Sequence, residues 1–436
     1  MVVFINKYQT TLTTSKVFCA LLVLVSITIA GCNDDNDDVL LENNDEPIFF
    51  SGVSRSDFID VEGNKTPHTA LLARCSILKK NDNSCSLNKL SFIAKTTSKP
   101  NKAEILDRLI VSDLWMADNF SMLLDKMPED IYRLFSSTTA IIIHKNIRPA
   151  FFWAVTGAIY LDPAFLWLTS EQLDSISQEP DFRQAFAQQF EFTTLSLYSL
   201  KGEPAFGSNR QRTETQTLHA LSALLFHELA HANDFFPIQT IVEADPNETP
   251  INIIQSQRLT SDLLNRLYPL RDETLHRLAS ALFAGQAASP SLLSLSANDV
   301  ASLFDVDHAN DTYAYFISPG ANPDWHFEDT ALLFEEVMMK IHFDLNRELA
   351  FATPLVDDVR FLDDLKINKN FINRFQDEQL LPRTQTVVDN LLPNNTHLDF
   401  FNELPNANEP AYLGNELSIK ARSKEGILIP YQHRHQ

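Results

Sequence analysis

The chain has 436 residues, of which 44% are hydrophobic and 21% charged, a composition typical of a globular protein rather than a disordered one. Its 10 glycines make up about 2% of the chain, against a usual ~7%, which excludes collagen and glycine-rich repeats. The formal net charge of −22 repels phosphate backbones and anionic lipid headgroups, so we expect no nucleic-acid partner.

The first 31 residues have the pattern of a signal peptide. Lys7 and Lys16 are the only charged residues before Asp34, and an apolar run, residues 17–30, follows Lys16. A membrane-spanning helix needs about 20 apolar residues, so this run is too short for a spanning anchor and suits a signal-peptide core.

The run ends in Ile29-Ala30-Gly31-Cys32, which resembles the lipobox of bacterial lipoproteins. The resemblance implies cleavage before Cys32 and acylation of that cysteine, which would anchor the protein to a membrane of the bacterial cell envelope, in the periplasm or at the cell surface. An uncleaved signal anchor or an ordinary secretory signal is the alternative. Residues 32–55 are polar and acidic, and we expect them to form a solvated tether.

Cys75 and Cys85 are the two cysteines that lie outside the signal segment and the lipobox. In an exported protein two such cysteines usually pair, and the short polar loop between them allows closure, so we predict a disulfide. The alternative, a pair of metal ligands, lacks close partners of the CxxC kind.

The pattern of the mature chain predicts an α+β fold that is predominantly helical. Apolar residues recur with a helical period over 102–127. Two segments, 138–144 and 151–161, have the composition of strands, and the intervening Pro149 allows a hairpin between them. Further helices are expected at 164–168, 180–190 and 272–283. No linker divides the chain, so we predict one domain, 56–436, with two lobes, 56–236 and 237–436, as the alternative.

The longest predicted helix, 214–236, contains the sequence His227-Glu228-Leu229-Ala230-His231. Histidines four residues apart share one helix face, about 6 Å apart, so that both imidazoles can bind one ion. Glu228 lies beside this face and could take a proton from an attacking water and pass it to a leaving amine. The alternative is a pair of buried structural histidines with an exposed glutamate.

This HExxH pattern resembles the zincin metallopeptidases, which the apolar Leu225, Leu229 and Ala232 also fit, whereas the polar Asn233 departs from their usual pattern. The glycine and third histidine of metzincins are missing. The resemblance therefore implies a gluzincin-type zinc site, completed by a glutamate from a later helix.

Glu328 is the expected third zinc ligand, in a helical segment within 323–339. The segment resembles the EDxAxxF helix of several HExxH peptidase families, in which the glutamate binds zinc and the next aspartate, here Asp329, supports it. Glu335 and Glu336 are rival ligands.

We expect other polar residues to support the metal site. Asp234 lies about 10 Å along the helix from His227, so we expect it to accept the spare N–H of His231 rather than to bind the ion. Zincins often place a tyrosine or histidine where it stabilises the oxyanion, and Tyr313, Tyr315 and His326 are the candidates.

The resemblance also implies that the strand at 156–161 offers an edge to an extended substrate. We therefore expect a lipid-anchored zinc peptidase acting on a peptide or protein substrate. Two alternatives remain open: a non-catalytic envelope lipoprotein that binds a protein or cell-wall partner, and a hydrolase of non-peptide amides or esters.

Overall fold

The computed structural model describes residues 50–414, except for 80, 98, 180, 201–202, 206–209, 256–257, 306, 318–325, 356–363, 393–396 and 405–411. The predicted signal peptide, the lipidation site Cys32 and most of the predicted tether lie outside these residues. Phe50 and Val53 are buried, so the chain is already packed before residue 55, where the tether was expected to end. Within the described part, no helix has the length and apolarity needed to cross a membrane.

The first sheet has four short strands in the order β1-β2-β4-β3. These strands are β1 (Leu109–Val111), β2 (Ile141–Ile143), β3 (Phe151–Trp153) and β4 (Ala158–Leu161). β2 pairs in parallel with both β1 and β4, and β3 pairs antiparallel with β4. Every residue of these strands is buried, as expected for a sheet that is covered on both faces.

The helix predicted over 102–127 is interrupted by β1. The chain forms α2 (Lys102–Leu106), then β1, then α3 (Leu114–Leu124). Leu109 to Val111 fit the helical period, but their backbone pairs with β2, from Ile141 to Ile143. A run of three apolar residues suits either structure, and the pairing with a distant strand decides between them.

The single strand predicted over 151–161 is also wrong, because a turn divides it into β3 and β4. Gly157 adopts a φ of +68°, a left-handed conformation that favours glycine, and its N–H donates to the carbonyl of Trp153. The hairpin is therefore β3–β4, and the predicted hairpin with 138–144 is replaced by the parallel pairing of β2 and β4. β4 is paired on both sides, so the segment 156–161 does not offer the free edge expected for a substrate.

The second sheet, which the sequence did not predict, has five antiparallel strands in the order β6-β5-β7-β8-β9. They are β5 (Thr193–Leu200), β6 (Glu203–Pro204), β7 (Asn346–Pro354), β8 (Leu365–Ile372) and β9 (Tyr412–Gly414). β5 belongs to the first lobe of the two-lobe alternative, and it pairs with β7 from the second. The sheet therefore contains strands from both sides of the boundary at 236/237. One hydrophobic core, which extends from Phe50 to Phe401, includes side chains from both sides of that boundary.

Helices surround both sheets, and the structure is α+β as predicted. They include α1 (Pro67–Ser76), α4 (Glu129–Leu134), α5 (Ser170–Ser175), α6 (Gln184–Ala187), α7 (Glu214–Phe235), α8 (Ile238–Glu243), α9 (Thr260–Leu267), α10 (Glu273–Ala284), α11 (Pro290–Leu293), α12 (Ala297–Leu303), α13 (Phe327–Phe343), α14 (Leu381–Leu391) and α15 (Leu398–Glu403). The predicted helix at 272–283 is confirmed as α10. The helix predicted at 180–190 is present only as the four residues of α6. The helix predicted at 164–168 is replaced by a 3-10 turn at Pro163–Phe165.

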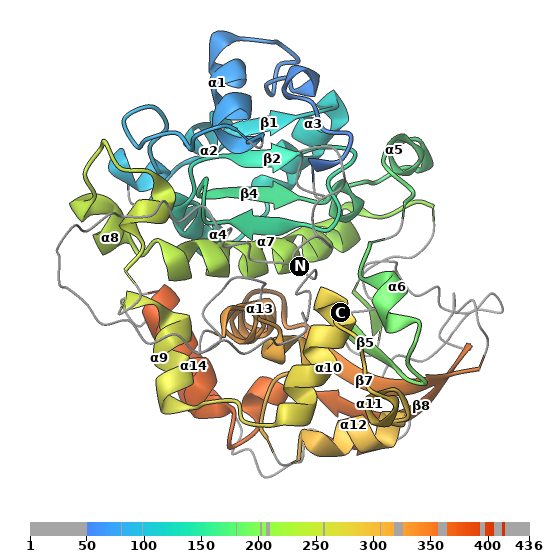
Figure 1. Ribbon diagram of the computed structural model, residues 1–436. Helices are drawn as coiled ribbons and strands as arrows, with labels where there is room; N and C mark the ends of the chain where they lie inside the picture. The colour runs from blue at the N-terminus through green and yellow to red at the C-terminus, as the bar shows by residue number, and fades with distance from the viewer. Residues whose placement is uncertain are drawn as a thin grey trace, which may run out of the picture.

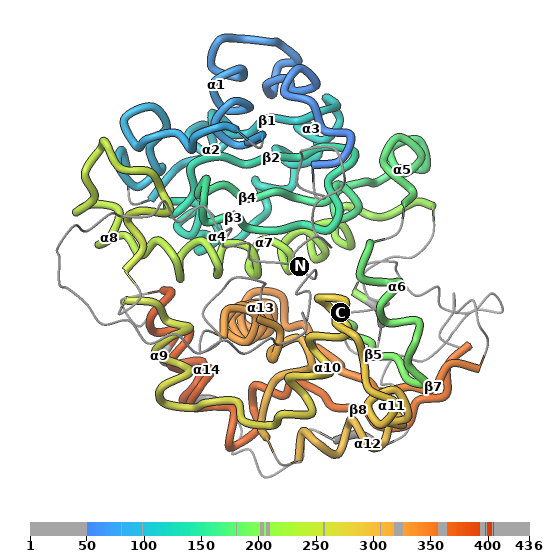
Figure 2. Tube along the Cα trace, in the orientation of Figure 1, coloured from blue at the N-terminus to red at the C-terminus, as the bar shows by residue number. Residues whose placement is uncertain are grey.

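Two long helices occupy the middle of the molecule. α7 runs below the first sheet and packs on β3 and β4, and α13 packs against α7 (Figure 1). The Cα trace shows α9, α10 and α14 on the side of α13 away from the first sheet (Figure 2). Residues on the facing surfaces of α7 and α13 are therefore enclosed between the two halves of the fold.

The predicted disulfide is confirmed, since Cys75 at the end of α1 is bonded to Cys85 in the following loop. The alternative of a metal-binding cysteine pair is therefore excluded for these residues.

Candidate metal centre

α7 forms where the sequence predicted it. Thr213 and Gln216 cap its N-terminus reciprocally, and the helix ends two residues before Pro237. From His219 to Phe235 every residue is buried, as expected of a helix enclosed between a sheet and another helix. The motif His227 to His231 therefore lies in the interior.

The structure brings together the three predicted metal ligands. Oε2 of Glu328, in the first turn of α13, lies 3.2 Å from Nε2 of His227 and 3.5 Å from Nε2 of His231. All three residues are buried. For a tetrahedral zinc ion with bonds of about 2.0–2.1 Å, neighbouring ligand atoms are separated by about 3.3 Å. These three residues could therefore hold a metal ion.

Electrostatics favour the charged form of Glu328. Burial raises the pKa of its carboxyl, but the charges of His231 and His227 and the hydrogen bonds from these residues outweigh burial, so the pKa lies below its ordinary value. A carboxylate that remains ionised in a buried position is suited to bind a cation.

Glu335 contacts the other side of His227 and not the cluster of donor atoms. Nδ1 of His227 lies 2.9 Å from Oε2 of Glu335, and the hydroxyl of Tyr198 donates to Oε1 at 3.0 Å. An Nδ1–H that donates to Glu335 leaves Nε2 of His227 free to bind metal. Glu335 is thus a group that orients His227, a role that the sequence did not predict. Glu336 is the other rival ligand, and its Oε2 lies 3.5 Å from Nη1 of Arg347.

Glu228 lies beside the ligands and is fully buried. Neither of its carboxylate oxygens has a hydrogen-bond partner among the residues that the structure describes. Burial raises the pKa of this carboxyl well above its ordinary value, opposed by the positive charges of His227 and Arg183. A divalent cation at the three ligands would act in the same direction as these two charges. The carboxyl is therefore available to exchange a proton with a group bound at the centre.

Tyr313 is the predicted tyrosine that the fold places near the centre. Its buried hydroxyl lies 3.4 Å from Nη1 of Arg183, which donates to it. Burial raises the pKa of Tyr313 well above its ordinary value, and the charges of Glu328 and Glu228 raise it further. Arg183, which the sequence did not indicate, is held by Asp181. Arg183 and Tyr313 together supply N–H and O–H donors near Glu228.

Tyr315 and His326 are engaged elsewhere. The hydroxyl of Tyr315 donates to Asp307 at 2.5 Å. Nε2 of His326 is hydrogen-bonded to Oδ1 of Asn265 at 2.7 Å. Among the described residues, neither group has a hydrogen bond to Glu228 or to the three ligand residues, so their roles at the centre remain predictions.

The supporting role predicted for Asp234 is wrong. Its Oδ1 accepts a hydrogen bond of 3.1 Å from the backbone N–H of Ser261, in the first turn of α9. Nδ1 of His231 has no hydrogen-bond partner among the described residues. Asp234 thus caps a neighbouring helix, where its negative charge is favourable.

Asp329 supports its neighbour Glu328 indirectly. Its carboxylate pairs with the guanidinium of Arg383 in α14, and both side chains are buried. This ion pair fixes the first turn of α13 against α14, and Glu328 is part of that turn.

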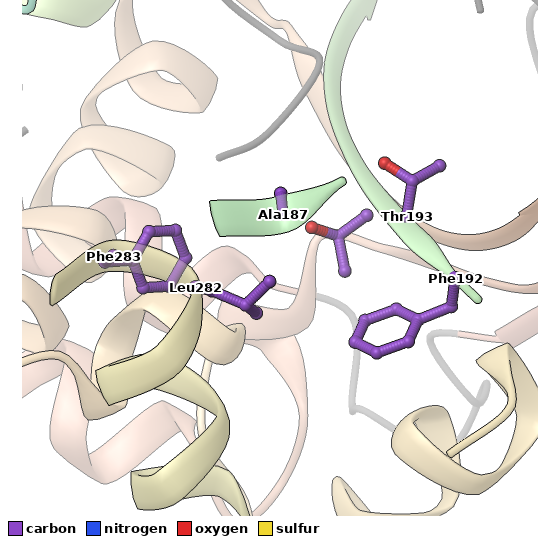
Figure 3. A pocket seen from close by; sticks show the side chains of 6 residues that line it. Ala187, Phe192, Thr193, Leu282 and Phe283 are labelled. Atoms are coloured by element: carbon purple, nitrogen blue, oxygen red, sulfur yellow. The ribbon is translucent and has the colours of Figure 1, made fainter. Parts of the chain in front are cut away.

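A small pocket lies between α6, the start of β5 and α10 (Figure 3). It is lined by Ala187, Phe192, Thr193, Thr194, Leu282 and Phe283. The ring of Phe283 packs edge-on against that of Tyr313, with 4.6 Å between centroids. The pocket wall therefore continues to a residue beside the candidate metal centre.

Comparisons of the chain with protein-family profiles, with curated proteins and with solved structures find no match. The functional argument therefore rests on the residues of this site.

Proposed function

We propose that this protein is a zinc-dependent peptidase with a zincin-type core, anchored through a lipidated Cys32 in the bacterial cell envelope. The observation that carries the proposal is the convergence of His227, His231 and Glu328 within the protein, beside the carboxylate of Glu228, which has no hydrogen-bond partner in the described part of the chain. The lipobox-like sequence at Cys32 supports the location. If the anchor is correct, Cys32→Ala should move the protein from the membrane fraction to the soluble fraction.

Each residue of the site has a role in amide hydrolysis. His227, His231 and Glu328 would hold a zinc ion, which would supply the Lewis acidity needed to activate the scissile carbonyl and the attacking water. Glu228 accepts the proton of that water and returns it to the leaving amine. The donors of Tyr313 and Arg183 stabilise the negative charge that develops on the carbonyl oxygen.

The decisive test is Glu228→Gln, assayed for zinc content and for cleavage of unfolded protein. We expect about one equivalent of zinc at the three ligands to be retained and cleavage to fall roughly 10²–10⁴-fold, because the proton acceptor is lost while the ligands remain. Glu214→Gln, an exposed glutamate on the same helix, is the control and should cleave normally.

The same experiment separates the alternatives. Zinc bound without turnover of any peptide by the unmodified protein would favour the non-catalytic lipoprotein, and turnover of esters or small amides alone would favour the other hydrolase. Normal peptide cleavage by Glu228→Gln would contradict the proposed mechanism.

A further inference from the structure

A second cluster of metal-ligating side chains lies outside the candidate centre. It comprises Asp130 on α4, His342 in the last turn of α13 and His397 directly before α15. Nε2 of His342 lies 3.0 Å, and Nε2 of His397 2.8 Å, from the same carboxylate oxygen, Oδ2 of Asp130. Three ligand atoms from distant parts of the sequence thus converge on one point.

This cluster is independent of the candidate metal centre. His342 follows Glu328 by 14 residues on α13, a rise of about 21 Å along the helix axis. Asp130 is buried, whereas the side chains of His342 and His397 are 18% and 13% exposed. The second cluster therefore reaches the solvent, which can supply a water as a further ligand.

The two imidazole rings are held in fixed orientations. The ring of His342 stacks on Phe226 of α7, with centroids 5.7 Å apart and an interplanar angle of 8°. The ring of His397 lies at 89° to that of His342, with 5.6 Å between centroids. Both Nε2 atoms nevertheless point to Asp130, so the ring positions already suit a shared ligand.

We propose that Asp130, His342 and His397 form a second, structural zinc site. Two imidazoles and a carboxylate are donors that zinc prefers, and a water would complete a tetrahedron. The nitrogen–oxygen separations need to widen by only a few tenths of an ångström to reach the roughly 3.3 Å that tetrahedral zinc requires. Movement of this size is feasible because both histidines lie at helix ends and are partly exposed.

The consequence of zinc binding here is a cross-link. A helix as short as α15, with six residues, is not stable by itself and depends on tertiary contacts. Zinc bound by the three residues would fasten the start of α15 to α4 and to the end of α13. The site would thus stabilise the C-terminal part of the fold without taking part in the proposed hydrolysis.

Zinc titration of the metal-stripped full chain tests the proposal. We expect two zinc ions per chain, one after the double substitution His227→Ala/His231→Ala, and none when Asp130→Asn is added to that double variant. Zinc should raise the unfolding midpoint of the double variant by a few degrees, and Asp130→Asn should abolish this rise. If the double variant is folded by circular dichroism and binds no zinc, the second site does not exist.

Further variants keep the test decisive if the double variant does not fold. His397→Ala, at a partly exposed position, should lower the zinc content from two to one. His308→Ala is the matched control, because His308 lies 4.0 Å from one carboxylate, Asp377, without a second histidine, and its loss should not alter the zinc content. Zinc content unaffected by His397→Ala would overturn the second site.

The outcomes separate this inference from the proposed function. One zinc per chain that depends only on His227 and His231 would refute the second site and leave the peptidase proposal intact. One zinc that depends only on Asp130 and His397 would refute the peptidase proposal and support the second site.

Discussion

His227 is held between two carboxylates that act on different ring nitrogens. Glu328 lies by Nε2, and Glu335 lies 2.9 Å from Nδ1. The side chain of Glu335 is itself held by the hydroxyl of Tyr198. The orientation of this proposed metal ligand thus depends on a chain of contacts that reaches β5, in the second sheet.

Replacement of Glu335 should therefore weaken metal binding without removing a ligand. We expect Glu335→Ala to reduce zinc affinity about 10–100-fold, because His227 loses the acceptor that fixes its tautomer and ring position. Competition with a chelator of known affinity measures the change. Glu335→Gln keeps an oxygen that can accept from Nδ1 and should restore most of the affinity. Equal affinities for the Ala variant and the unmodified protein would show that Glu335 does not orient the ligand.

The sequence predicted the ligands better than their supporting residues. The spacing of His227 and His231 is sufficient because a helix fixes their relative positions, and Glu328 was identified from its EDxAxxF-like segment. Asp234 was misassigned because its partner, Ser261, comes from another element. Glu335 was considered only as a rival ligand, because its contact with Nδ1 of His227 depends on how α7 and α13 pack.

At the scale of elements, long helices were more predictable than short strands. α7 and α10 carry complete signals, with capping residues at their N-termini and, for α7, a proline after the last turn. β1 has three residues, and its structure depends on pairing with β2. β5 and β7 were missed because they pair across a long stretch of sequence: β5 precedes α7 in the chain, and β7 follows α13.

The turn between β3 and β4 gives a prediction about stability. A Cβ at Gly157 would lie 2.8 Å from a ring carbon of Phe92 and 3.0 Å from the methyl of Thr139, and the φ of +68° is already unfavourable for other residues. We expect Gly157→Ala to lower the free energy of unfolding by about 2–4 kcal/mol, as backbone strain and overpacking add. Denaturant unfolding measures this change.

Gly63 provides the matched control for this prediction. Its φ is +82°, but a Cβ there would meet only Leu114, at 3.9 Å. Gly63→Ala should therefore carry the strain of the backbone alone, about 1 kcal/mol. Equal losses of stability in the two variants would mean that Phe92 and Thr139 make room for the added methyl group.

At the scale of the whole molecule, the second sheet joins the two halves of the sequence. β5 pairs with β7 along seven residues, from Thr193 opposite Ala352 to Ser199 opposite Asn346. Arg347 of β7 reinforces this pairing, since its Nε donates to the hydroxyl of Ser196 at 2.9 Å and its guanidinium is paired with Asp311. Because of this shared sheet and core, neither half should be stable without the other.

We therefore expect one cooperative unfolding transition in denaturant, measured with a chelator present so that metal release does not contribute. Trp115, Trp153 and Trp167 lie in the first half of the chain, so tryptophan fluorescence chiefly follows that half, whereas far-ultraviolet circular dichroism follows helices throughout. The two signals should have the same midpoint.

Ser196→Pro makes this test more stringent, because Ser196 lies opposite Leu349 of β7, and a proline there should disturb both the strand pairing and the contact with Arg347. If the halves are coupled through the sheet, the variant should lower both midpoints by the same amount, although most of the tryptophans lie far from Ser196 in the sequence. A shift in circular dichroism with unchanged fluorescence would show instead that the first sheet and its helices unfold independently, and the metal centre between α7 and α13 would then lie between two separately stable parts.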